Sequence, residues 1–305
     1  MQLEEELRRF APKQDTLLTI GVFDGVHLGH RHLIDHLKRQ ARSRSLLAGV
    51  VTFKEHPELV LKVSESLYYL SRLEERLSLL EGLGVDLVAP LSFTPEIAQL
   101  GARRFVALLM QHLRMRGLVV GPDFAMGKGK EGSIEVLRQI GNELGFTIET
   151  VPPLFLEGHA VRSTAIREAL ARGDVVLAAK MLGRPFHLVG PVVHGDARGR
   201  TLGFDTANIS LNARRALPAD GVYATVAYVD DHAYKSVSNI GLRPTFHGKE
   251  RLVEVHLLDF KGDLYQKEVK IEFVERLRPE KQFASADELK AQIAHDVERA
   301  RSILG

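Results

Sequence analysis

Residues 21–30 (GVFDGVHLGH) constrain the fold of this chain more than any other segment. They follow the apolar run 17–20, which is typical of a short buried strand, and precede the amphipathic stretch 33–41, which is typical of a helix. A strand that breaks into glycines before a helix brings backbone N–H groups and the positive end of the helix dipole to one place. His27 and His30 add imidazole donors there. The segment is therefore predicted to hold the phosphates of a nucleoside triphosphate.

This string is not one of the common phosphate-binding motifs, because it lacks both G-x-x-x-x-G-K-[ST] and G-x-G-x-x-G. The alternative interpretation is a glycine-rich turn in which two histidines happen to lie near a helix start. A bare His-x-x-His would favour that alternative. The whole string, placed between a strand and a helix, favours phosphate binding.

The composition narrows the class of protein. The 305 residues suffice for two domains with separate cores. The 41 basic and 39 acidic residues nearly cancel, so we expect neither nucleic acid nor a membrane surface as a partner. The absence of cysteine excludes disulfides, thiolate catalysis and cysteine zinc sites. The acidic N-terminus is not that of a signal peptide and no apolar run reaches the length of a membrane span, which indicates a cytoplasmic protein. The oligomeric state stays open, a homo-oligomer included.

The first 183 residues alternate strand-like and helix-like segments. Further strands are expected at 46–53, 86–90, 118–120 and 146–151, and helices at 71–82, 102–113 and 133–144. Ser71 is expected to cap the first of these helices. The alternation is typical of an α/β domain with a doubly wound parallel sheet. In such sheets the ligand lies beyond the carboxyl ends of the strands, where residues 21–30 would fall.

Beyond residue 183 the pattern changes. Strand-like runs follow one another without helices, at 186–193, 221–228, 235–240, 251–259 and 268–273. This spacing favours a small antiparallel β-barrel or sandwich. A terminal amphipathic helix, from Ser285 or Asp287 to Leu304, is expected to cover one side of it.

Three further clusters are predicted at the sheet edge that carries residues 21–30, namely residues 52–57, 121–127 and 162–167. In the last cluster Ser163 or Thr164 is expected to cap a helix. Their hydroxyls, with Arg167 one turn on, suit the β- and γ-phosphates of a nucleotide. Each cluster alone has an ordinary structural explanation, but their joint occurrence at successive strand ends indicates a site.

The second half carries two groups of its own. Residues 195–208 combine glycines and arginines that suit a loop over phosphates, and Thr206 and Asn208 offer oxygen ligands for Mg²⁺. Glu254 alternates with Val253 and Val255, so it faces the opposite side of its strand. A solvated strand carboxylate is one interpretation. If the barrel lumen or mouth lies on the Glu254 side, a general base is the other.

Several of these segments resemble a known family. The string 21–30 resembles the signature of the HxGH nucleotidyltransferases, whose histidines bind ATP phosphates. With residues 203–208 (GFDTAN), 243–246 (RPTF) and 264–265 (LY), the order of clusters resembles the bacterial bifunctional riboflavin kinases/FMN adenylyltransferases over nearly the whole chain. The resemblance implies a domain over 1–183 that converts FMN and ATP to FAD and pyrophosphate. It also implies a β-barrel over 184–305 that phosphorylates riboflavin with ATP and Mg²⁺.

The resemblance implies the residues of both sites as well. It gives the catalytic roles to His27, His30 and Glu254. It gives ATP binding in the first domain to Gly21, Phe23, Asp24, Gly25, His27, His30, Ser163, Thr164 and Arg167, and FMN binding to His56, Pro57, Asp123 and Phe124. In the kinase domain it gives ATP binding to Gly195, Gly199, Arg200, Gly203, Thr206 and Asn208, of which Thr206 and Asn208 hold the metal.

The chain departs from the family pattern at a few positions. Asp205 stands where the kinase motif has proline and adds a carboxylate beside the expected metal ligands; Glu55, Met126, Arg162 and Gln266 also differ. Two alternatives therefore stay open at this point. One is adenylyl or cytidylyl transfer to another acceptor. The other is an adenylyltransferase whose barrel binds flavin and regulates without phosphorylating riboflavin.

Overall fold

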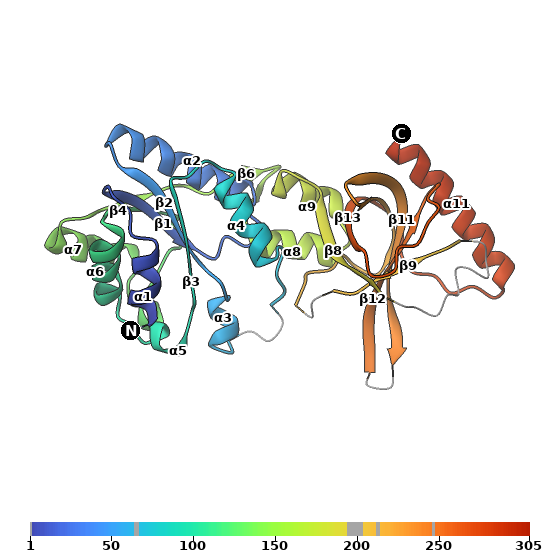
Figure 1. Cartoon of the computed structure of the whole chain (residues 1–305), viewed down its shortest axis with the longest axis horizontal. Helices are drawn as coiled ribbons and strands as arrows, with labels where there is room; N and C mark the ends of the chain where they lie inside the picture. Colours follow the sequence, from blue (N-terminus) through green and yellow to red (C-terminus); the bar gives the residue numbers. More distant parts are fainter. Residues whose placement is uncertain (1, 64–66, 194–203, 212–213, 246–247) are drawn as a thin grey trace. The chain divides into compact units, whose positions relative to one another are not determined.

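A computed structural model describes residues 2–63, 67–193, 204–211, 214–245 and 248–305 of the chain. The chain forms two compact units, Met1–Ser163 and Thr164–Gly305 (Figure 1).

The first unit is built on a five-stranded sheet in the order β3-β2-β1-β4-β5, and every neighbouring pair is parallel. Its strands are β1 (Thr16–Gly21), β2 (Leu47–Phe53), β3 (Leu87–Leu91), β4 (Met115–Val120) and β5 (Thr147–Thr150). Its helices are α1 (Gln2–Arg9), α2 (Leu28–Ser43), α3 (Pro57–Val60), α4 (Leu73–Glu81), α5 (Pro95–Ala98), α6 (Ala102–Leu113) and α7 (Ile134–Leu144), with a 3₁₀ turn, η1 (Lys128–Lys130). A short antiparallel pair, β6 (Phe155–Leu156) and β7 (His159–Ala160), precedes the second unit.

Successive residues of the strands pack into two separate cores, one on each face of the sheet. Leu18 and Ile20 of β1 pack with buried residues of α1, α6 and α7. Leu17, on the other side of the same strand, packs with buried residues of α2 and α4. Since successive side chains of a strand point to opposite faces, helices cover both faces of the sheet, which confirms the doubly wound α/β architecture.

The sheet order brings the expected loops to one edge. The segments that follow β1, β2 and β4 all leave the carboxyl ends of strands that are neighbours in the sheet, with β1 in the middle (Figure 1). The chain passes from β1 to β2 on one side and returns to β4 on the other, so the edge beyond β1 and β4 is where the strand order reverses. Ligands of open α/β sheets bind at such a point.

The second unit is a closed six-stranded antiparallel barrel in the order β10-β11-β12-β9-β8-β13. Its strands are β8 (Phe186–Val193), β9 (Ala207–Ile209), β10 (Gly221–Val229), β11 (His232–Thr245), β12 (Gly248–Leu257) and β13 (Glu268–Arg278). Its helices are α8 (Ser163–Ala171), α9 (Val175–Leu182) and α11 (Ala286–Leu304), and Ser285 caps the last of these as expected. The predicted barrel with a terminal helix is thereby confirmed.

Two faces of the barrel wall can be told apart. The rings of Phe186, Tyr223 and Phe273 contact one another and are buried, which marks the inward face. On the same face of the wall the Thr225 hydroxyl lies 2.8 Å from that of Ser236. The opposite face of β10 and β11 packs against α11 (Figure 1). A barrel of this size is filled by side chains, so a ligand has to bind outside it.

Candidate functional site

The loop after β1 has an unusual backbone. Phe23 and Val26 adopt positive φ angles of 55° and 38°, and Gly25 lies between them with φ 78°. Positive φ is costly for a side chain that is β-branched, as in Val26, yet both Phe23 and Val26 are buried. A Cβ atom at Gly21 would lie only 3.2 Å from the Phe23 ring, so this ring packs directly against the end of β1. Strain of this kind is kept where the surroundings over-determine the backbone and is common at ligand sites.

Asp24 holds this loop in place. Its carboxylate is buried and accepts the backbone N–H groups of Leu70 at 2.9 Å and Ser71 at 3.1 Å. The Ser71 hydroxyl donates to the same carboxylate and accepts the N–H of Gly25 at 2.9 Å. The expected role of Ser71 as the cap of α4 is therefore wrong, since Arg72 is the N-cap and Ser71 serves the loop instead.

The two histidines of the string form one unit at the start of α2. His27 is the N-cap, and its Nδ1 accepts the backbone N–H of His30 at 3.2 Å. In a neutral imidazole the proton must then lie on Nε2. The two rings stack, with centroids 3.6 Å apart and planes 18° from parallel, and the Phe23 ring meets His30 edge-on. Both imidazoles are thus held at the positive end of a 16-residue helix.

Burial lowers the pKa of the His30 imidazole well below its usual range, and the charges of His27 and Arg76 lower it further. His30 is accordingly neutral near pH 7 when no anion is bound. Its Nδ1 is buried and has no hydrogen-bond partner. A phosphate oxygen next to the ring would favour the protonated form.

The segment before α8 packs against the two histidines. A Cβ atom at Gly29 would lie 2.4 Å from the Val161 carbonyl oxygen, so only glycine fits at this position between His27 and His30. The Ser163 hydroxyl donates to the Asp24 carbonyl at 3.0 Å. Ser163 is the first residue of α8 and Thr164 the second, and the capping role expected of one of them stays a prediction. Thr164 and Arg167 continue along α8.

The loops after β2 and β4 carry the residues expected to bind FMN. His56 caps α3, its Nδ1 accepting the N–H of Glu58 at 3.3 Å, and Pro57 is the first residue of that helix. Asp123 is exposed and Phe124 is half-buried in the loop that follows β4. These loops flank the loop after β1, because β2 and β4 are the neighbours of β1 in the sheet.

A second constellation lies on the outside of the barrel. Glu254 of β12 is directly opposite Asn208 of β9 and Asn239 of β11. Opposite residues of antiparallel strands project from the same face. Val253 and Val255 are fully buried and occupy the inward face. The lumen position that was considered for Glu254 is therefore wrong, because the interior is filled and the carboxylate lies on the outer wall.

The oxygen donors expected for Mg²⁺ fit a metal site. The Oδ1 atom of Asn208 is buried and has no hydrogen-bond partner among the residues that the structure describes. Thr206, two residues earlier, is exposed. A buried carbonyl oxygen without a donor is costly, and a hard cation would satisfy it. The other expected ATP-binding residues of this site, Gly195, Gly199, Arg200 and Gly203, lie outside the described residues.

Comparisons with known proteins show the family of the chain. A family model described as FAD synthetase matches residues 10–165, and one described as riboflavin kinase matches residues 182–304. A bifunctional riboflavin kinase/FMN adenylyltransferase from Escherichia coli K12 is 43% identical, over 97% of this chain and 95% of its own length. The protein of the same name from Bacillus subtilis is 37% identical, over 93% and 91%. The chain belongs to this bifunctional family.

Membership of the bifunctional riboflavin kinase/FMN adenylyltransferases confirms the predicted enzyme of flavin-cofactor synthesis, with riboflavin, FMN and ATP as substrates. It does not favour the alternative of a barrel that only regulates. A crystal structure described as a macrolide-efflux protein from Streptococcus pneumoniae is 32% identical, with a TM-score of 0.89 over 99% of this chain and 97% of that one. Within the described part of this chain, no helix is long and apolar enough to cross a bilayer.

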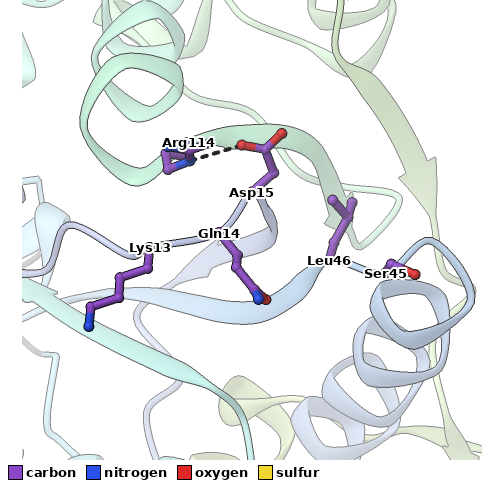
Figure 2. A pocket seen from close by; sticks show the side chains of 6 residues that line it. All are labelled: Lys13, Gln14, Asp15, Ser45, Leu46 and Arg114. Atoms are coloured by element: carbon purple, nitrogen blue, oxygen red, sulfur yellow. Dashed lines mark hydrogen bonds and ion pairs between the residues drawn. The ribbon is translucent and has the colours of Figure 1, made fainter.

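A hollow elsewhere on the first unit contains none of the predicted residues (Figure 2). It is lined by Lys13, Gln14, Asp15, Ser45, Leu46 and Arg114. All six come just before the first residues of β1, β2 or β4, so the hollow lies at the edge opposite the histidines. The Asp15 carboxylate there already accepts Arg114 at 3.0 Å and Arg116 at 2.8 Å.

Sequence reasoning missed the residues that support the sites. Ser71 and Arg76 approach the loop after β1 from more than forty positions further along the chain, and no local pattern indicates this role for either of them. Asn239 could have been found once the barrel register was known, because it is then placed opposite Glu254.

Proposed function

We propose that His27 and His30 are the catalytic residues of FMN adenylyl transfer. In this reaction the FMN phosphate attacks the α-phosphorus of ATP and pyrophosphate leaves. The protein needs to align the two phosphates and to stabilise charge on their oxygens. The stacked imidazoles at the start of α2 support this role, since His27 presents an Nε2–H donor and the His30 ring lies parallel to it at the same helix end.

The remaining ATP-binding assignments divide into two kinds. Gly21, Phe23, Asp24 and Gly25 shape the loop, because the Asp24 carboxylate is occupied by Leu70 and Ser71. Ser163, Thr164 and Arg167 are proposed to bind the β- and γ-phosphates, with Lys128 or Lys130 neutralising the departing pyrophosphate. His56, Pro57, Asp123 and Phe124 are proposed for FMN.

For riboflavin phosphorylation we propose Glu254 as the general base. It accepts the proton of the ribityl 5′-hydroxyl, whose oxygen attacks the γ-phosphorus of ATP while ADP leaves. Thr206 and Asn208 are proposed to hold Mg²⁺, which supplies neutralisation of the phosphate charge when bound. The placement of Asn208 opposite Glu254 supports a shared site. Gly195, Gly199, Arg200 and Gly203 are proposed as further ATP contacts.

The adenylyltransferase domain is proposed to span residues 1–183 and the kinase domain residues 184–305. A cytoplasmic location, without a nucleic-acid partner, is supported by the nearly balanced charge and the absence of cysteine. Light scattering on the purified chain decides whether it forms a homo-oligomer.

One assay tests the proposal as a whole. The full chain is incubated with riboflavin or FMN, together with ATP and Mg²⁺, and the flavins are separated. FMN and FAD from riboflavin, and FAD from FMN, are the expected products. FAD from FMN but no product from riboflavin would overturn the kinase assignment, and no flavin product at all would overturn both.

A further inference from the structure

Arg76 is a fully buried cation next to the adenylyl-transfer site. It belongs to α4, and its side chain is 1% exposed. Its Nη2 donates to the carbonyl oxygens of Phe53 at 2.8 Å and Lys54 at 3.1 Å. These carbonyls lie at the carboxyl end of β2, the strand beside β1. The guanidinium is therefore held at the same sheet edge as the loop after β1, which leads to His27 and His30.

The rest of this guanidinium is not satisfied. Its Nε and Nη1 atoms are buried without a hydrogen-bond partner. Within the described ranges, no carboxylate lies within ion-pair distance of Arg76; Asp24, Tyr69, Glu55 and Glu74 act on it only through space. Asp24 is itself saturated by Leu70 and Ser71. A buried guanidinium in this condition costs stability and calls for an explanation in function.

The charge of Arg76 acts on His30, one of the two imidazoles proposed to bind phosphate. Burial lowers the pKa of His30 most, and the charges of His27 and then of Arg76 lower it further, so the guanidinium and the His30 ring share one weakly screened environment. In such surroundings a fixed charge acts over several ångströms without contact, because water does not intervene.

We propose that Arg76 is a positioning residue for adenylyl transfer, supplying a buried positive charge that makes the His27–His30 cradle attract the polyphosphate of ATP. The inference rests on the proposed function of these histidines. Burial keeps His30 uncharged when no anion is bound, and Arg76 adds to that effect, so the empty site holds one fixed guanidinium charge beside a neutral imidazole. Asp24, Glu55 and Glu74 act on this charge only through space, and the phosphates of ATP would add negative charge beside the His27–His30 pair.

The test compares Arg76→Lys, which keeps the charge, with Arg76→Met, which removes it at similar length. Steady-state adenylyl transfer gives kcat and the KM for ATP, and inhibition by inorganic pyrophosphate gives a polyphosphate affinity. For Arg76→Met we expect the KM for ATP and the pyrophosphate inhibition constant each to rise on the order of tenfold. For Arg76→Lys we expect changes of less than about threefold, because the charge remains. Riboflavin kinase activity of the same chains should stay unchanged and controls for the amount of active chain, and urea unfolding of each variant shows whether the unit that holds Arg76 is folded.

A second readout separates this role from mere packing. The His30 imidazole is titrated by ¹⁵N NMR, with its signal assigned through His30→Gln. Removal of the cation in Arg76→Met should raise the His30 pKa, while burial and the charge of His27 still hold it below the ordinary imidazole range. An unchanged His30 titration in Arg76→Met, or equal kinetic losses in the two variants, would overturn the proposal. His27→Ala is measured alongside. A normal adenylyl-transfer rate in His27→Ala refutes the histidine site itself, whereas a slow His27→Ala together with unaffected Arg76 variants refutes only the role of Arg76.

Discussion

The arrangement of His27 leads to a clear expectation for its removal. Substitution by alanine deletes both a cap of α2 and a donor to the triphosphate. We expect His27→Ala to lower the rate of FMN adenylyl transfer by about 10²–10³, as loss of one charge-stabilising donor does. FAD formation from FMN measures this, with FMN formation from riboflavin as the internal control. A near-normal adenylyl-transfer rate would refute the assignment.

Gly29 has no room for a side chain at the start of α2. A methyl group there would lie 2.4 Å from the Val161 carbonyl oxygen, so either α2 or the segment around Val161 must move. Because a displacement of about 1 Å costs on the order of 10²-fold in rate, we expect such a loss for Gly29→Ala. Overpacking should also lower the free energy of unfolding by about 1–3 kcal/mol. Kinetics and urea unfolding of the same preparation measure both, and an unchanged rate would show that the close fit has no catalytic role.

His27, His30 and the loop after β1 could be predicted from the sequence, because their spacing is local and the loop follows a strand. The distant residues that hold this loop in place could not be predicted. Asp24 is held by Leu70 and Ser71, and the partners of Arg76 are carbonyls of β2, so these contacts exist only once the sheet is assembled. The sequence assigned Ser71 to a helix cap because Ser-x-x-Glu is a capping pattern, and tertiary contact overrode that preference.

At the scale of elements, most helices and strands lie within a few residues of the predicted bounds, and β9 is the exception that matters for the site. The helix at 102–113 and the strand at 186–193 have the predicted bounds. The sequence predicts a loop over 195–208, but Ala207–Ile209 forms β9, because pairing with β8 and β12 rather than a local pattern makes this strand. This strand matters, since it sets Asn208 opposite Glu254. The lumen hypothesis failed for a related reason: alternation separates two faces but does not say which of them is enclosed.

The docking of α1 should depend on pH. Glu6 is buried and accepts Ser92 N at 2.8 Å and Lys54 Nζ at 3.1 Å. Burial raises the pKa of Glu6, but the hydrogen bonds from Ser92 and the Lys54 charge outweigh it, so the pKa is lowered overall. A carboxyl with a lowered folded-state pKa stabilises fully above its unfolded pKa of about 4.3, and the gain is lost as pH falls through the folded value.

We therefore expect Glu6→Gln to lower the free energy of unfolding by about 1–3 kcal/mol at pH 7. The difference from the wild type should shrink below about pH 4. Urea unfolding at both pH values measures it. Glu5→Gln is the matched control, because Glu5 is exposed and pairs only with Arg9 on the surface. A difference that is independent of pH would contradict the linkage.

At the scale of the whole molecule, the two activities should be separable by single substitutions in different units. His27 lies in the parallel-sheet unit, and Asn208 lies in the barrel. Asn208→Ala removes the buried oxygen proposed for Mg²⁺ but leaves the histidine loop intact. Alone, His27→Ala should convert riboflavin to FMN and stop there. Asn208→Ala should make FAD from FMN and nothing from riboflavin.

A mixture of the two variants tests whether the sites work independently. FMN made by His27→Ala is released and becomes substrate for Asn208→Ala, so the mixture should convert riboflavin to FAD although neither variant does so alone. The FAD rate should rise with the concentration of either variant until the other limits it, because the intermediate passes through solution. EDTA should stop FMN formation in the mixture, and excess Mg²⁺ should restore it. If FMN accumulates in the mixture while Asn208→Ala still adenylylates added FMN, release from the kinase site is too slow and independence fails. If Asn208→Ala alone makes FMN from riboflavin at the wild-type rate, the assignment of Asn208 to the kinase site fails instead.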